Sequence, residues 1–145
     1  MATATKFQIF CEDLAKGEHV IVAGGGDTLM LALSNAANPP SVSADAVLAD
    51  ITTISLTNLV DATPNVTVSS SAQSSGTYTL KITDYVFTAT GAVGPFQYVI
   101  LYNSTATSKT NPLIVYVDYG SEITLGAGDT FTVNFDDAAG VLTIA

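Results

Sequence analysis

The sequence is poor in the residue types from which catalytic and phosphate-binding sites are usually built. It contains no arginine and no tryptophan, one histidine and one cysteine among 145 residues. Four lysines stand against thirteen acidic residues, which gives a formal net charge of −9. An acidic chain repels the phosphates of nucleic acids. The composition therefore predicts a structural protein, with no enzymatic activity, no cofactor, no metal and no nucleic-acid partner.

The sequence also lacks long apolar segments. No run approaches the roughly 18 apolar residues of a membrane-spanning helix. The first residues show no basic segment followed by an apolar run and a cleavage site, which a secretory signal would require. We therefore expect a soluble product of the cytoplasm that has no membrane contact.

β-branched and aromatic residues dominate what remains, and they favour sheets. The chain length suits one domain, 1–145, with a real core. Alternating apolar residues separated by Gly, Asp and Asn turns predict an antiparallel β-sandwich, jelly-roll-like, with one short N-terminal helix. Two nearly continuous apolar runs, 96–102 and 113–119, predict the centre of the sheet. Further strands are expected at 29–33, 78–82, 85–87, 123–125, 131–135 and 141–144.

The helix is predicted over about 5–16. Phe7, Phe10 and Leu14 recur there at helical spacing, and acidic residues occupy the opposite side. Cys11 falls beside the two phenylalanines. We therefore expect it to be a small buried apolar group, since a single cysteine forms no internal disulfide.

Three segments lack a clear pattern of their own. The glycines at 24–26 lack the Lys and Ser/Thr of a phosphate-binding loop, so a flexible connector is expected. The stretch after Pro40 is compatible with a helical turn at 44–48 or with a strand at 51–59. Residues 62–76 are small and polar, which predicts an exposed, flexible loop or a loosely held edge.

Two groups of residues could form chemical sites, but we expect structural roles for both. Cys11 and His19 could in principle pair as nucleophile and base, but no catalytic signature surrounds them, so packing or capping is expected. Acidic residues near strand ends could meet as a metal site or an acid/base pair. They do not follow a calcium-loop spacing, so we expect them to accept hydrogen bonds from turn amides. These acids are Asp84, Asp118, Glu122, Asp136 and Asp137.

The tyrosines fall mostly within predicted strands. An aromatic binding face would use Tyr98, Tyr102, Tyr116 and Tyr119, but cross-strand pairing inside a sheet is the simpler explanation for these residues. A carbohydrate-binding module is the corresponding alternative function. The absence of tryptophan counts against that alternative, because tryptophan is the strongest aromatic platform.

Parts of the sequence resemble a family of small virion proteins from tailed bacteriophages. The most specific part is the turn GAVGPF at 91–96, which leads into the Tyr98 strand. The chain departs from the family pattern after Ser55, where LTNL at 56–59 replaces a Gly-aromatic loop. The similar stretches are 4–19, 27–39, 47–55, 74–103, 112–136 and 140–144.

The resemblance implies a phage structural protein, and we expect a capsid decoration (cement) protein that binds and stabilises the assembled head. Its partner would be the major capsid protein, and a homo-oligomer, with a trimer favoured, is expected. It would lie on the surface of the phage head in the virion and in the host cytoplasm before assembly. The alternative is a tail or neck (head-tail connector) component. The residues predicted for the interface are Phe7, Phe10, Leu14, Val66, Val68, Tyr98 and Tyr102.

Overall fold

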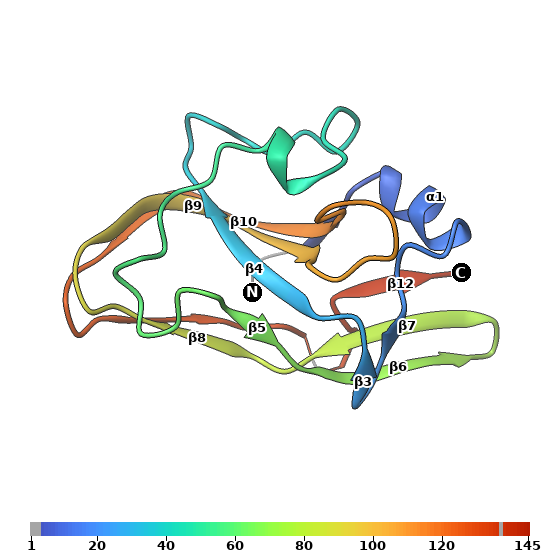
Figure 1. Ribbon diagram of the computed structural model, residues 1–145. Helices are drawn as coiled ribbons and strands as arrows, with labels where there is room; N and C mark the ends of the chain where they lie inside the picture. The colour runs from blue at the N-terminus through green and yellow to red at the C-terminus, as the bar shows by residue number, and fades with distance from the viewer. Residues whose placement is uncertain (1–3, 137) are drawn as a thin grey trace.

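Antiparallel strands form a sandwich, which confirms the predicted fold class. The computed structural model in Figure 1 describes residues 4–136 and 138–145. The larger layer is a five-stranded sheet with the order β1-β10-β9-β4-β5. Its strands are β1 (Ala4–Lys6), β4 (Leu29–Ser34), β5 (Asn65–Val66), β9 (Val93–Asn103) and β10 (Leu113–Leu125).

The opposite layer consists of two smaller sheets, which lie below β9 and β10 in Figure 1. A three-stranded sheet contains β12 (Leu142–Ile144), β7 (Thr77–Ile82) and β6 (Val68–Ser74), in that order. A two-stranded ribbon pairs β11 (Thr130–Val133) with β8 (Tyr85–Thr88). The remaining elements are a hairpin of β2 (Ile21–Val22) and β3 (Gly25–Gly26), the helix α1 (Ile9–Ala15) and a 3-10 turn η1 (Leu48–Asp50).

The main core fills the space between the layers. Most side chains of β4 and β9 are buried on both faces of the sheet, which explains why these strands read as nearly continuous apolar runs. The predicted positions of the central strands are therefore confirmed. Members of this core include Leu29, Leu31, Leu33, Leu80, Ile82, Phe87, Val99, Leu101, Val115, Val133 and Phe135.

A second, smaller core covers the outer face of the five-stranded sheet. The chain between β4 and β5, which carries η1, lies above this face in Figure 1. Ile54 N donates to Leu33 O at 2.8 Å, and Leu48 N donates to Asn111 O at 2.9 Å. These bonds hold the segment over Phe7, Ala32, Ile51, Tyr98, Ile100, Tyr102 and Leu113.

The predicted helix is real but starts later than expected. Residues Ala4–Lys6 form β1 against β10, with Ala4 opposite Val117, and Phe7 N extends the ladder to Ile114 O at 3.1 Å. Pairing with β10 thus makes a strand of residues whose local spacing also suits a helix. The helix begins at Ile9 and ends at Ala15, and Gly17 follows with a φ of 77°.

The predicted loop at 62–76 is wrong for most of its length. Asn65–Val66 form β5, and Val68–Ser74 form β6, which pairs with β7 around a turn at Ser75 and Gly76. Small polar residues bury little area, but their backbone groups still hydrogen bond to the neighbouring strand. The alternative of a sheet edge is confirmed, because β6 is the last strand of its sheet.

Three other local predictions need correction. The glycines at 24–26 form part of the β2–β3 hairpin and not a simple connector. Residues 51–59 contain no strand, and the helical turn lies at Leu48–Asp50, slightly later than 44–48. The turn expected within GAVGPF at 91–96 instead contains the start of β9 at Val93, and the Gly94–Pro95 peptide there is cis. Among the described residues, no helix is long and apolar enough to cross a membrane.

Candidate functional site

Most of the residues predicted for an interface lie inside the molecule. Phe7 and Phe10 are fully buried, in the outer and main cores respectively. Val66, Tyr98 and Tyr102 are also buried, so in this fold they offer a partner little surface. Leu14, on α1, is 37% exposed, and Val68 is half-buried at the start of β6. Helical spacing located apolar side chains but did not show that the sheet already covers them.

The tyrosines make the contacts that cross-strand pairing predicts. The rings of Tyr98 and Tyr116 meet edge to face with centroids 6.0 Å apart, and Phe7 lies 5.5 Å from Tyr116. Tyr119 packs against Phe131 at 4.9 Å. Burial raises the pKa of Tyr119. These rings are part of the packing between strands and layers and do not form an open aromatic platform.

Cys11 and His19 occupy different environments. Cys11 is exposed, so its predicted burial is wrong, and Lys6 Nζ donates to its Sγ at 2.9 Å. His19 is buried 5.0 Å from the ring of Phe10, as packing predicted. Its Nδ1 lies 3.2 Å from Asn103 Nδ2. The exposed thiol and the buried imidazole are therefore not arranged as a nucleophile and its base.

A partly buried polar cluster joins α1 and the residues just after it to the loop between β9 and β10. Lys109 Nζ donates to both carboxylate oxygens of the buried Asp13, at 2.8 and 2.9 Å. Glu18 accepts hydrogen bonds from the backbone amides of Ser108 and Lys109, each at 2.9 Å. Burial lowers the pKa of His19, while nearby carboxylates oppose that effect. The cluster fixes the chain at this end of the sandwich.

The other acidic residues serve mainly as hydrogen-bond acceptors in turns. Asp136 accepts from the amides of Ala138 and Ala139, each at 2.8 Å, and these bonds lower its pKa. Asp118 accepts from Gly120 N at 2.7 Å, and Asp84 accepts from Phe135 N at 2.8 Å. Within residues 4–136 and 138–145, no three His, Cys, Asp or Glu side chains group into a metal site. The predicted bonding to nearby amides is confirmed for Asp136 and Asp118, whereas Asp84 binds an amide 51 residues away in the chain.

Two further predicted acids complete the group. Glu122 accepts from Ala36 N at 3.1 Å and so links β10 to the segment that covers the sheet. Asp137, also considered as a ligand, lies outside the described residues.

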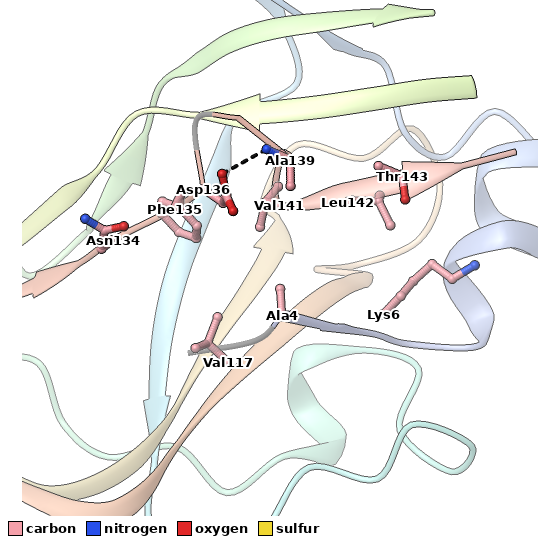
Figure 2. Close-up of a pocket in the computed structure, with 11 residues that line it drawn as sticks. Ala4, Lys6, Val117, Asn134, Phe135, Asp136, Ala139, Val141, Leu142 and Thr143 are labelled. Carbon is pink, nitrogen blue, oxygen red and sulfur yellow. Dashed lines mark hydrogen bonds between the residues drawn. The ribbon is translucent and has the colours of Figure 1, made fainter. Parts of the chain in front are cut away.

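One groove of about 440 Å³ opens between the two layers beside β1 and β12. Figure 2 shows the residues that line it, and Val117, Val141 and Leu142 supply apolar side chains. The charged residues of the lining have partners within the chain. Asp136 binds the amide of Ala139, as the dashed line in Figure 2 marks, and Lys6 binds Cys11. The groove is therefore a gap between the two layers. Its charged side chains, Lys6 and Asp136, bind other groups of the same chain.

The sequence did not single out one exposed surface of the opposite layer. The ribbon of β8 and β11 buries Phe87 and Val133 on one face, and its other face presents Val86 to solvent. Val60 lies beside β8, because its amide donates to Thr88 O at 2.9 Å. Alternation along the predicted strand at 85–87 puts Val86 on the opposite face from Tyr85 and Phe87. We call this surface the β8–β11 outer face, and its members are Val60, Val86, Thr88, Thr130 and Thr132.

Comparison with known proteins gives no identification of this chain. It matches no family model, no curated protein sequence and no solved structure.

Proposed function

We propose that the protein is a structural component of a tailed-phage virion, and specifically a decoration (cement) protein of the head. The observation that carries the proposal is the likeness of six stretches of the chain to small phage virion proteins, with GAVGPF at 91–96 as its most specific piece. The fold is compatible with this role. A sandwich with two cores is a stiff body that can fold before it meets its partner.

The charge of the chain also suits a protein that stays dispersed until it meets an assembled shell. A net charge of −9 opposes premature self-association and contact with the packaged genome. Binding to the shell but not to its loose subunits would stabilise the shell through linkage. In this proposal the partner is the major capsid protein and the site is the outer surface of the head. The protein assembles there as a homo-oligomer, with a trimer favoured.

The proposal is tested by counting copies of the protein in purified virions. Quantitative mass spectrometry should find it in hundreds of copies per particle, in fixed proportion to the major capsid protein. A dozen copies or fewer would contradict a role over the head surface. Virions without the polypeptide would overturn any virion role.

A tail or neck component is the second candidate, and one structural feature favours it. Strand β6 ends its sheet, and Ala72–Ser74 and the following turn are exposed. An uncharged sheet edge of this kind can accept a strand from a neighbouring subunit, as rings and tubes built by strand addition require. The low copy number described above would support this alternative.

A further inference from the structure

We propose that the β8–β11 outer face is the surface that docks on the shell. We further propose that the matching surface of the shell protein has lysine or arginine side chains around an uncharged centre. The inference rests on the proposed function, because it names the partner as the shell protein. It adds which face of this chain is used and what chemistry recognises it.

The geometry of the face follows from strand pairing. Val86 lies opposite Thr132, and Thr88 lies opposite Thr130, in the antiparallel register of β8 and β11. Successive side chains of a strand point to opposite faces, so these four share the side that faces away from the buried Phe87. The face belongs to the ribbon at the lower left of Figure 1.

Val60 extends the face on the other side of β8. Leu59 and Ala89 form an antiparallel bridge, and both are buried. The next residue, Val60, therefore points outward beside Thr88. Three chain segments thus lie side by side and present one continuous surface.

The centre of the face is uncharged and built from β-branched side chains. Val60 is 70% exposed and Val86 is 50% exposed, and they are the two most exposed large apolar residues described. Valine and threonine have few rotamers, so little side-chain entropy is lost when a partner covers them. Such a centre with a polar border has the anatomy of a protein interface.

Three exposed carboxylates flank the ribbon that carries the face, and hydrogen bonds hold them in place. Asp61 follows Val60 and accepts hydrogen bonds from Tyr85 Oη and Thr63 N, at 2.8 and 2.9 Å. These bonds lower the pKa of Asp61, so it is ionised at neutral pH. Asp84 precedes β8 and Asp129 precedes β11, and each accepts a backbone amide hydrogen bond. Fixed carboxylates at both ends of the ribbon favour a partner with basic groups.

A second copy of this chain fits the face poorly, because the same three carboxylates would meet their counterparts. The four lysines do not relieve that repulsion. Among the described contacts, Lys6 donates to Cys11, Lys16 pairs with Glu12 and Lys109 pairs with Asp13. Lys81 alone cannot match three acids. Charge complementarity therefore points to a different protein, and the proposed function makes it the shell protein.

The test compares two valine-to-lysine variants that differ only in the face they change. Val86→Lys places a positive charge in the proposed contact, whereas Val20→Lys changes a valine of nearly equal exposure, 49%, just before β2. Each variant is mixed with shells assembled from the phage's major capsid protein alone, and bound protein is measured by co-sedimentation. We expect Val86→Lys to bind about tenfold more weakly or worse, and Val20→Lys to bind as the wild type does. Wild-type binding should also weaken as salt rises.

Each outcome tests either the choice of this face or the decoration role. Equal binding by wild type and Val86→Lys overturns the choice of this face but leaves the decoration role intact. Failure of the wild type to bind shells overturns the decoration role and this inference with it. A wild-type oligomer that Val86→Lys splits into monomers would show that the occupant is a second copy, which also contradicts the proposal. If Val86→Lys unfolds by circular dichroism, Val60→Lys takes its place.

Discussion

The two lysine–carboxylate pairs of this protein have very different surroundings. Asp13 is buried and depends on Lys109, whereas Glu12 and Lys16 meet on the exposed side of α1. We predict that Lys109→Met lowers the free energy of unfolding by about 3 to 5 kcal/mol, because it leaves an uncompensated buried carboxylate. Urea denaturation at neutral pH measures the change.

Lys16→Met is the matched control for that variant, since it removes the same charge from a surface pair. It should leave stability almost unchanged, because exposed ion pairs are weak. Equal effects of the two substitutions would contradict the burial of Asp13.

The single histidine makes stability depend on pH near neutrality. Burial lowers the pKa of His19 below its usual 6.5, so the unfolded chain gains a proton before the folded chain does. Stability therefore falls as pH drops below about 6.5, and the loss is complete below the folded pKa. His19→Gln should flatten the dependence of unfolding free energy on pH between 7.5 and 5.5. A variant with the wild-type slope would refute this assignment.

At the scale of elements, the sequence predicted the strands in which apolar residues alternate or run continuously. The runs at 96–102 and 113–119 became the central strands because both faces are covered, and Phe87 and Val86 point to opposite sides as expected. The helix start and β6 were missed, because in both segments pairing with a distant strand outweighs the local pattern.

The candidate interface was harder to predict than the fold. Phe7 and Tyr98 carry apolar surface, but only the segment around η1, folded over the sheet, shows that this surface is already buried. Val60 has no strand of its own, and its place beside Thr88 depends on long-range backbone pairing, which includes the bridge between Leu59 and Ala89. No spacing rule in the sequence brings these two segments together.

The close approach of Gly140, just before β12, to strand β7 allows a prediction about stability at the same scale. Gly140 has a φ of 82°, and an added Cβ would lie 2.7 Å from Leu80 O in the neighbouring strand. Gly128 has a φ of 90° and open space around it. Gly128→Ala should cost about 1 to 2 kcal/mol for its backbone alone, and Gly140→Ala should cost more, because it also pushes the strands apart. Thermal unfolding compares them, and equal costs would contradict the close approach of Gly140 and Leu80.

Across the whole molecule, the negative charge is also part of what holds the turns together. Backbone amides lower the pKa of Glu18, Asp50, Asp61 and Asp136 below their usual 4.5 or 3.8. The unfolded chain therefore takes up protons first as pH falls below about 4.5, and stability is lost as pH passes down through the folded values. Denaturation between pH 6 and 3 should show this loss.

Asp136→Asn tests the contribution of one turn to that acid sensitivity. The variant should be less stable than wild type at neutral pH, and the difference should shrink as pH falls below about 3.8, because the unfolded wild-type carboxyl then takes up a proton before the folded one does. A constant difference across this range would mean that the charge of Asp136 does not matter to its turn.

We propose that this protein is a stiff acidic body that binds to a larger assembly. The most direct measurement is a cryo-electron microscopy map of the intact phage particle. The account predicts density on the outside of the head into which the sandwich fits, with the β8–β11 outer face toward the shell. A complete particle map whose head surface and remaining density exclude this fold would contradict the account.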